Sequence, residues 1–406
     1  MGRRLGRFAA MDESEPQSIL CSRYLCASRR LHVPLHIWRL FNVVGGNRGA
    51  EPRGRRYRSF DRPADFAEIR RWTIRTGRGV SVGNPKVLLT GAHGFLGAEV
   101  ARLLATRSPV VPIWAASRRA TEAPGLHSGF AQPFELDITR NFELPNGLQT
   151  IIHVAGEKRD TTRMRLVNDS GTRRLVEAAA RAGARHFVHI SSVGVYGAPA
   201  HAGMVTEAYR HAPRNMYEST KDAAELAVRE LCERLGMSYV ILQPSNVLGY
   251  VPGRSYPLLG LMRSVSSGRF MWFGNGLPIA NYVAVEDVAG ATITVALDEA
   301  RSGVFIVNTP ATLLDMVGWV AEDLRVAIPS RRMPVWMGGL MAMSATAAQR
   351  ITRRALPFSQ ERLLELTNTT RYDGSALIGA TGFAYPFGLR RALSVLVRAY
   401  RREGKL

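Results

Sequence analysis

The feature that most constrains the fold is a glycine-rich turn that joins a short apolar run to a helical segment. Residues 86–90 read KVLLT, and after GAHGFLG the chain continues as AEVARLLATR, whose apolar spacing is that of a helix. In such a turn Gly91 permits a tight bend, Gly94 permits close approach of a phosphate to the backbone, and Gly97 permits close packing of helix on strand. This order of elements predicts the start of a βαβ unit.

Strand-like and helical segments alternate from this turn to about residue 245. The apolar runs VVPIWAA, TIIHVA, HFVHISS and SYVILQP are separated by helical stretches such as ESTKDAAELAVRELCERLG. This alternation predicts an α/β fold with a Rossmann-type, doubly wound parallel sheet. We expect residues 85–245 to form a dinucleotide-binding domain. We expect residues 246–406 to form mainly a smaller C-terminal substrate lobe, with 281–310 returning to the Rossmann core.

Residues 1–84 differ in composition from the rest of the chain. They contain 17 arginines against seven acidic residues, are punctuated by Gly and Pro, and show no sustained helical or strand period. This composition predicts a basic, disordered N-terminal extension. A mitochondrial transit peptide and an over-long reading frame that truly begins near residues 80–82 are the alternatives.

Charge and cysteine content exclude several classes of function. Four of the 54 basic residues are lysine, and the arginines behind the net charge of +21 are scattered, so no nucleic-acid partner is predicted. Cys21, Cys26 and Cys232 lack the spacing of a metal site or a disulfide framework, so no metal is expected. No run of 18 apolar residues occurs, which predicts a cytoplasmic protein without an integral membrane segment. The glycine-interrupted stretch 333–348 is predicted to be a buried helix, with a surface-docking helix as the alternative.

The second strand-like run ends in WAASRR, at a position that selects between dinucleotides. An acidic residue here would accept the ribose 2′-hydroxyl of NAD. Ser117, Arg118 and Arg119 stand here instead, and arginine suits the 2′-phosphate of NADP by charge and by stacking. The sequence therefore favours NADP, with NAD as the alternative.

Tyr217 and Lys221 lie four residues apart in YESTK, which places them on one face of a helix. A lysine ammonium beside a phenol is expected to lower the pKa of Tyr217 toward the working range. Tyr217 would then exchange a proton with the substrate oxygen when hydride moves at the same carbon. Ser192, in SSVGVYG, would hold that oxygen by a hydrogen bond. The pattern predicts hydride transfer at a carbinol or carbonyl carbon of a small molecule.

Taken together, these motifs make residues 86–395 resemble the extended short-chain dehydrogenases, the NAD-dependent epimerase/dehydratase family. TGxxGxxG lies at 90–97 and YxxxK is intact. HVAG at 153–156 resembles HxAA with Gly156 in place of Ala, and QPSNVLG at 243–249 resembles RPxxVxG with Gln243 in place of Arg. The segments NYVAVEDVAGA and YDGSALIGATGFAYPFGLRRAL resemble later motifs of the family.

The resemblance implies roles for individual residues and a homodimeric assembly. Tyr217 would be the acid/base, Lys221 would bind the nicotinamide ribose as well as tune Tyr217, and Ser192 would polarise the substrate oxygen. The implied dinucleotide contacts come from the glycine turn, the strand ends and the facing helices: Gly91, His93, Gly94, Phe95, Leu96, Gly97, Ser117, Arg118, Asp137, Ile138, Val154, Ala155, Gly156, Asn168, Tyr217, Lys221, Pro244, Asn246 and Val247.

The substrate is less constrained than the chemistry. Val193 and Gly194 stand where sugar dehydratases of the family carry two carboxylates, which disfavours elimination of water. The family, and a diphosphate's need for cations such as Arg254, Arg263 and Arg269, favour a nucleotide sugar, although these arginines are equally consistent with solvated surface charges. A hydroxysteroid or dihydroflavonol-like dehydrogenase/reductase is the alternative, to which VWMGGLMAM and the missing Arg at 243 are suited. A non-catalytic cofactor-binding regulator is less favoured, because Ser192, Tyr217 and Lys221 are intact. Reductase and epimerase both remain open.

Overall fold

The computed structural model describes residues 87–106, 113–119, 131–199, 203–251, 258–274, 277–352, 363–364 and 366–406. The basic segment 1–84, which contains Cys21 and Cys26, and Arg254 lie outside these residues.

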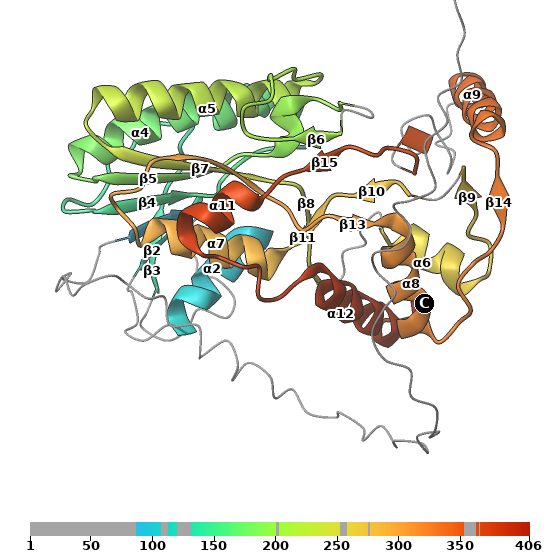
Figure 1. Cartoon of the computed structure of the whole chain (residues 1–406). Coiled ribbons are helices and arrows are strands. Elements are labelled where there is room, and N and C mark those ends of the chain that lie inside the picture. Colours follow the sequence, from blue (N-terminus) through green and yellow to red (C-terminus); the bar gives the residue numbers. More distant parts are fainter. Residues whose placement is uncertain are drawn as a thin grey trace, which may run out of the picture. The chain divides into compact units, whose positions relative to one another are not determined.

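A seven-stranded parallel sheet organises the larger part of the described chain (Figure 1). Its order is β12-β7-β5-β4-β1-β2-β3, and all of its neighbouring strands run parallel. The strands are β1 (Val87–Thr90), β2 (Ile113–Ser117), β3 (Ala131–Glu135), β4 (Thr150–His153), β5 (His186–Ile190), β7 (Ser238–Pro244) and β12 (Gly303–Val307). The chain runs outward from β1 to β3 and then returns to β4 on the other side of β1. This reversal confirms the doubly wound topology and creates a switch point at the carboxyl ends of β1 and β4, where such sheets bind ligands.

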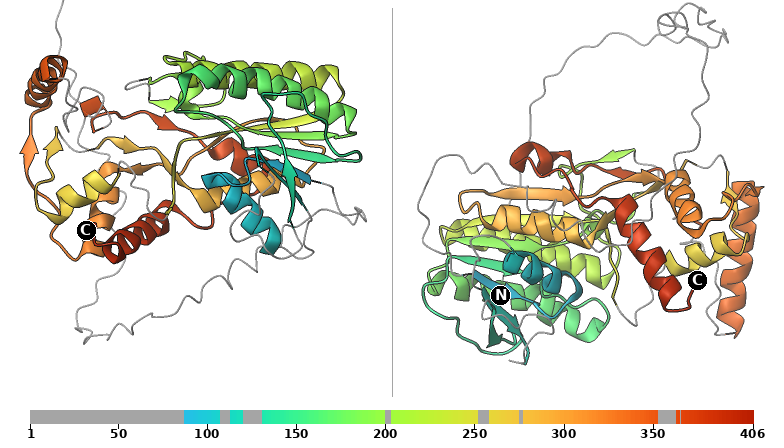
Figure 2. Two further views of the ribbon diagram at one scale, coloured as in Figure 1. Left: turned by 180° about the vertical axis from the view of Figure 1, so that it is seen from behind. Right: turned by 90° about the horizontal axis from the view of Figure 1, so that it is seen from below.

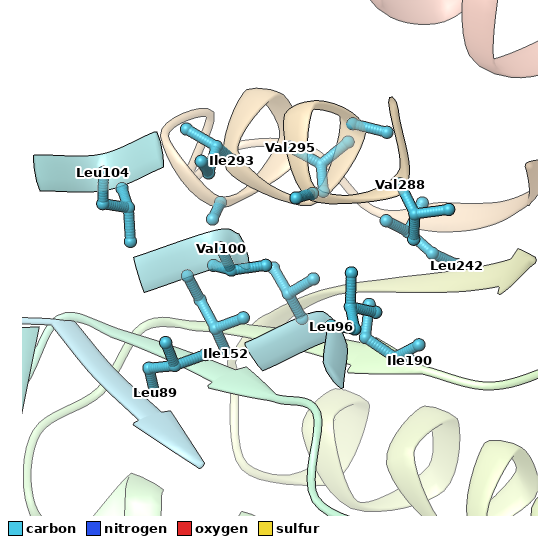
Figure 3. Packing of buried hydrophobic residues seen from close by; sticks show 14 of the residues in the cluster. Leu89, Leu96, Val100, Leu104, Ile152, Ile190, Leu242, Val288, Ile293 and Val295 are labelled. Atoms are coloured by element: carbon cyan, nitrogen blue, oxygen red, sulfur yellow. The ribbon is translucent and has the colours of Figure 1, made fainter. Parts of the chain in front are cut away.

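Helices cover both faces of the sheet because consecutive strand residues point to opposite sides. Leu89 and Ile152 pack with α2 (Phe95–Thr106) and α7 (Val285–Ala296), as Figure 3 shows. Leu88 and Ile151 pack on the other side with α4 (Thr172–Arg181) and α5 (Met216–Arg234). Strands buried on both faces read as continuous apolar runs, which is the pattern from which they were predicted.

A smaller C-terminal lobe has a core of its own (Figure 2). Helices α6 (Leu258–Ser266), α8 (Leu313–Leu324) and α12 (Leu389–Arg402) surround buried Met262, Met316 and Leu393. Short strand pairs link the parts of the chain: β8 (Asn246–Leu248) with β11 (Tyr282–Ala284), β10 (Ile279–Ala280) with β13 (Ala311–Thr312), β9 (Trp272–Phe273) with β14 (Arg332–Met333), and β6 (Met204–Val205) with β15 (Arg371–Tyr372). Helix α11 (Ser375–Thr381) precedes α12.

The lobe is joined to the Rossmann core through a buried carboxylate. Asp287, in the first turn of α7, accepts hydrogen bonds from the backbone N–H groups of Phe387 (2.8 Å) and Gly388 (2.8 Å), where α12 begins. A carboxylate at a helix N-terminus satisfies N–H groups that have no partner within the helix. This contact explains why the VEDV and YPFG segments, a hundred residues apart, belong to one structural unit.

Helix α9 (Val335–Thr352) shows that the prediction of a buried helix over 333–348 is wrong. Its side chains Trp336, Leu340 and Met343 are 67%, 56% and 58% exposed. The inward side of the helix instead carries Gly338, at which an added Cβ would lie 2.6 Å from Cδ1 of Phe273. Within the described part of the chain, no helix is long and apolar enough to cross a membrane.

We expect Gly97→Ala to lower the free energy of unfolding by about 1–3 kcal/mol, the usual cost of overpacking. The reason is that a Cβ at Gly97 would lie 2.0 Å from the carbonyl oxygen of Gly91, so α2 and the turn must separate. Urea unfolding of the two proteins measures the difference.

Gly379→Ala is the matched control for Gly97→Ala. Gly379 also lies in a helix, α11, but a Cβ there meets no atom within 4 Å. Alanine is favoured over glycine inside a helix, so this variant should be stabilised by roughly 0.5–1 kcal/mol. Equal effects of the two substitutions would contradict the packing argument.

Candidate functional site

The glycine turn lies at the switch point of the sheet and is shaped by close backbone contacts. Gly91 has φ +71°, and a Cβ there would lie 2.8 Å from the backbone nitrogen of Ala155, in the loop after β4. The N–H of Gly94 donates to the carbonyl of Gly91 (2.8 Å), which closes the turn just before α2. The first turn of α2 carries no acidic residue. A helix N-terminus without negative charge suits a pyrophosphate.

A buried histidine ties the first strand, the fourth strand and a helix together beneath this turn. Nδ1 of His153 is 2.7 Å from Oγ1 of Thr90, and its Nε2 is 3.0 Å from Oγ1 of Thr172. Oγ1 of Thr90 also accepts the N–H of Ala155 (3.2 Å). Burial lowers the pKa of His153 to about 3, so the ring is neutral and acts as a structural link. The sequence analysis assigned no individual role to His153, although this residue is part of the HVAG motif.

Asn168 fixes the loop that follows β4. It lies in a π-helical segment (Arg165–Gly171) between α3 (Thr161–Met164) and α4, an irregularity that is frequent at functional sites. Its Oδ1 accepts the N–H of Glu157 (2.7 Å), and its Nδ2 donates to the carbonyl of Glu157 (2.8 Å) and to Oγ1 of Thr220 on α5 (3.0 Å). Asn168 therefore holds the loop Val154–Gly156 against the helix that carries Tyr217 and Lys221.

Polar residues at the ends of the second and third strands make hydrogen bonds with residues two positions further along the chain. Oγ of Ser117 donates to the carbonyl of Arg119 (2.5 Å), and Arg118 is exposed. Asp137 accepts from the N–H (3.0 Å) and Oγ1 (2.6 Å) of Thr139, and chiefly the bond from this hydroxyl holds the pKa of Asp137 below its usual value. Ile138 is buried against Gly171. These side chains stand at the carboxyl edge of the sheet.

The remaining predicted dinucleotide contacts lie in three places. Leu96 is buried in the core, and Phe95 packs at Gly249, where a Cβ would lie 2.8 Å from its ring. Pro244 ends β7, and the strand β8 that follows contains Asn246 and Val247, opposite Tyr282 and Val283. His93 is exposed in the glycine turn.

Ser192, Tyr217 and Lys221 are brought together from a loop and a helix. Ser192 follows β5, and its Oγ accepts the N–H of Gly194 (3.1 Å). Tyr217 lies in the first turn of α5 and is hydrogen-bonded to the side chain of Ser192. Nζ of buried Lys221 donates to the carbonyl of Ile190 (2.7 Å), the last residue of β5. A Cβ added at Gly156 would lie 3.5 Å from this Nζ, an ordinary contact that alanine would also make.

Hydrogen bonds in both directions cap the N-terminus of α5 and so fix Tyr217 in its first turn. Oδ1 of Asn215 accepts the N–H of Glu218 (2.9 Å). Glu218 in turn accepts the backbone N–H of Arg214 (2.7 Å) and its guanidinium (3.2 Å). This arrangement is a variant of the capping box, in which the side chain near the helix start reaches back to the preceding backbone.

The prediction that Lys221 lowers the pKa of Tyr217 is wrong for this structure. Burial raises the pKa of Tyr217, and the hydrogen bond with Ser192 opposes this only in part. Burial also lowers the pKa of Lys221, to about 8, while Glu225 opposes that change. Both groups have lost water that would stabilise their charged forms, and the ammonium points at a carbonyl. Tyr217 is therefore a neutral phenol at neutral pH, ready to donate a proton.

A buried polar network lies one helical turn beyond Lys221 and was not predicted. Nε2 of Gln243 donates to both carboxylate oxygens of Glu225 (2.9 and 3.0 Å), and Tyr196 donates to Oε1 of Gln243 (2.5 Å). Burial raises the pKa of Glu225. Because Gln243 is fully buried, its replacement of the usual arginine does not favour an apolar substrate, contrary to our interpretation of the sequence. In the sequence, the i, i+4 spacing of Lys221 and Glu225 could have indicated that Glu225 lies beside the site.

The arginines proposed to hold a diphosphate receive little support. Arg263 is exposed, and its Nε donates to the carbonyl of Lys405 near the C-terminus (3.0 Å). Arg269 is exposed as well. Among the described residues, no cluster of three or more His, Cys, Asp or Glu side chains is placed to hold a metal ion.

Comparison with known proteins identifies a family. The sequence pattern of the NAD dependent epimerase/dehydratase family matches residues 87–307. The N-acetyl-alpha-D-glucosaminyl-diphospho-ditrans,octacis-undecaprenol 4-epimerase of Escherichia coli is 27% identical over 76% of this chain and 93% of its own length. Sterol demethylase protein B of Methylococcus capsulatus is 27% identical over 79% of this chain and 99% of its own.

Solved structures show the same fold. A UDP-glucuronic acid 4-epimerase from Bacillus cereus in complex with NAD superposes with a TM-score of 0.58 and 19% identity, over 78% of this chain and 97% of its own. RMD from Pseudomonas aeruginosa complexed with NADPH gives a TM-score of 0.56 and 20% identity, over 78% and 99%.

We expect Lys221→Met to stabilise the protein at about pH 7 by roughly 1–3 kcal/mol, because a buried ammonium is costly even with one hydrogen bond. The pKa of Lys221 is about 8 in the folded protein and near 10.5 when unfolded, so the folded state binds fewer protons between these values. The wild type therefore gains stability as the pH rises through this window, and the advantage of the variant shrinks. Urea unfolding at several pH values measures it.

Lys158→Met is the matched control, since Lys158 is exposed. It should change stability little. An Lys221→Met protein that is less stable than the wild type at neutral pH would show that the ammonium is better solvated than its burial indicates.

Proposed function

Because the chain belongs to the NAD dependent epimerase/dehydratase family, we propose that it transfers hydride between a nicotinamide dinucleotide and a carbinol or carbonyl carbon of a nucleotide sugar. The observation that carries this proposal is the grouping of Ser192, Tyr217 and Lys221 at the carboxyl end of β5, beside the switch point of the sheet. The reaction is a one-way oxidation or reduction, or an epimerisation that performs both in turn.

The described residues fit a bound dinucleotide. The turn of Gly91, Gly94 and Gly97 meets the N-terminus of α2, and an extra Cβ at Gly91 or Gly97 would collide with backbone. Asn168 holds Val154–Gly156 in place, and Arg118 and Asp137 stand at the strand ends on the adenosine side. We propose NADP as the preferred form, since Arg118 supplies a cation where an acidic residue would favour NAD.

The bound nicotinamide supplies or accepts hydride, and the side chains of this chain manage the proton. In the oxidative direction the substrate C–H bond breaks with its electron pair leaving as hydride, and the O–H proton passes to the phenolate form of Tyr217, which must first have released its own proton. In the reductive direction Tyr217 gives that proton back to the oxygen. Ser192 orients the oxygen, and Lys221 holds a ribose and compensates charge that develops on Tyr217.

Elimination of water is not part of this proposal. A carboxylate at position 194 would be needed, but this position is Gly194, and a Cβ there would lie 3.1 Å from Cγ of Glu218, so the Glu218 side chain would have to shift slightly. The Glu218 carboxylate itself is engaged by Arg214 as a helix cap. The site therefore favours a simple redox or epimerisation cycle.

A second candidate is oxidation or reduction of a hydroxysteroid or another lipid alcohol. It is favoured by the match to sterol demethylase protein B over 99% of that protein's length. The same three residues would act on the same type of carbon, so only the substrate distinguishes the two candidates.

We expect Tyr217→Phe to reduce turnover by about 100-fold or more, the usual contribution of a positioned acid/base, while dinucleotide binding stays within about twofold. Absorbance of the reduced dinucleotide, followed with a panel of nucleotide sugars and 3-hydroxysteroids, measures turnover. Isomer analysis of the product separates an epimerase from a reductase.

Tyr239→Phe is the matched control, because the Tyr239 hydroxyl binds Glu233 at the surface (3.2 Å). It should leave turnover unchanged. Full activity of Tyr217→Phe would refute the mechanism, and turnover of steroids alone would select the second candidate.

We expect Arg118→Ala to weaken binding of NADPH about tenfold or more and binding of NADH little, because a charge-assisted hydrogen bond contributes about 1.5–3 kcal/mol. Fluorescence titration with each dinucleotide measures both constants. The control is Arg119→Ala, at the neighbouring exposed arginine. Tenfold tighter binding of NADH by the wild type would overturn the assignment of NADP.

A further inference from the structure

Helix α9 presents a continuous apolar face to solvent. Trp336, Leu340 and Met343 are each more than half exposed, and their spacing of i, i+4 and i+7 places them on one side of the helix. Met337 and Met341, 39% and 47% exposed, widen this face. In Figures 1 and 2 the helix lies at the edge of the C-terminal lobe, beyond β9 and β14 and away from the large sheet. A patch of this kind marks an interaction site.

The opposite side of α9 is anchored to the lobe by small residues. A Cβ at Gly338 would lie 2.6 Å from the ring of Phe273 on β9 and 2.9 Å from Cδ1 of Leu363, and Ala342 is fully buried. The strand before the helix, β14, pairs with β9. Helices of globular proteins normally bury their large apolar side chains, whereas α9 buries glycine and alanine and exposes tryptophan, leucine and methionine. Its outward face is therefore built to be covered by something else.

The charge around α9 indicates what covers it. Residues 324–360 contain six arginines and no acidic residue, in a chain with 33 acids. Two of these arginines, Arg331 and Arg332, are exposed immediately before the helix. A second copy of the chain would bring like charges together, which opposes self-association through this face. An anionic lipid surface offers phosphates to the arginines and an apolar boundary to tryptophan and leucine.

We propose that α9 is an interfacial helix that docks the C-terminal lobe onto an anionic phospholipid surface. The helix is about 27 Å long but does not qualify as a membrane span, so it lies in the plane of the surface. Trp336, Leu340 and Met343 enter the boundary between headgroups and acyl chains, and Arg331 and Arg332 bind lipid phosphates. This proposal does not depend on which reaction the site catalyses.

Sedimentation of the full chain with lipid vesicles tests the proposal. We expect binding to phosphatidylcholine vesicles with about 25% phosphatidylglycerol, weak binding to pure phosphatidylcholine, and release by about 0.5 M salt. Leu340→Glu should weaken partitioning about tenfold or more, because it removes an apolar side chain that the membrane buries. Leu314→Glu is the matched control, since Leu314 is 45% exposed on α8. NADPH binding, measured alongside, should be equal in all three proteins and shows that they are folded.

Tryptophan fluorescence reports on α9 itself, even where another segment contributes to binding. Phosphatidylcholine with brominated acyl chains, mixed with phosphatidylglycerol, should quench emission of the wild type, and Trp336→Phe should remove most of that quenching. Unchanged binding by Leu340→Glu, or unchanged quenching in Trp336→Phe, would overturn the proposal. Light scattering that shows a dimer for the wild type and a monomer for Leu340→Glu would also overturn it, in favour of a contact between copies.

Discussion

The ammonium group of Lys221 is buried at the centre of the candidate site, and the arrangement of its neighbours follows from that. It has one carbonyl partner, Ile190, and Glu225 lies one helical turn away. On the sheet beneath it, His153 and His189 lie with ring centroids 5.3 Å apart, and both are kept neutral by burial and by the nearby cation. A charge in such surroundings interacts strongly with any group that changes charge beside it, because little water screens it. Burial of the Lys221 ammonium therefore has two effects: it lowers the stability of the folded protein, and it makes the charge effective in hydride transfer.

The parallel sheet makes that burial possible. Because β1, β4 and β5 run parallel, their carboxyl ends lie at one edge of the sheet, and each strand end provides one part of the site: Gly91 after β1, Gly156 after β4 and Ser192 after β5. The first turns of helix α5 lie at the same edge and add Tyr217 and Lys221. Asn168 and His153 then fix the loops relative to one another through short hydrogen bonds. The site is thus assembled from backbone ends of rigid elements, and side-chain packing far from the site can hold its geometry.

Local patterns were sufficient to predict the sheet, its double winding and the family. The apolar runs of β1, β4, β5 and β7, the glycine turn and the YESTK motif each consist of residues that are close together in the sequence. The errors concern properties that depend on residues distant in sequence. Whether Tyr217 is a phenol or a phenolate depends on burial by several elements, and Gln243 can be understood only when Glu225 and Tyr196 are placed around it. The link from Asp287 to Phe387 has the same character, since a lone buried acid in a helical segment does not reveal its partner.

The wrong prediction for α9 points to a property of this helix. The glycine-interrupted apolar stretch 333–348 is of a kind that normally lies in a core, and its two glycines did not alter that expectation. In the structure Gly338 and Ala342 form the buried side, and a Cβ at Gly338 would lie 2.6 Å from Phe273 and 2.9 Å from Leu363. The large apolar side chains are then exposed to water, which is unfavourable. Consistency between local pattern and tertiary packing is the rule in folded proteins, and exceptions concentrate at functional surfaces. The arginine-rich, acid-free sequence on both sides of the exposed face identifies an anionic, apolar partner as the environment in which α9 is no longer an exception.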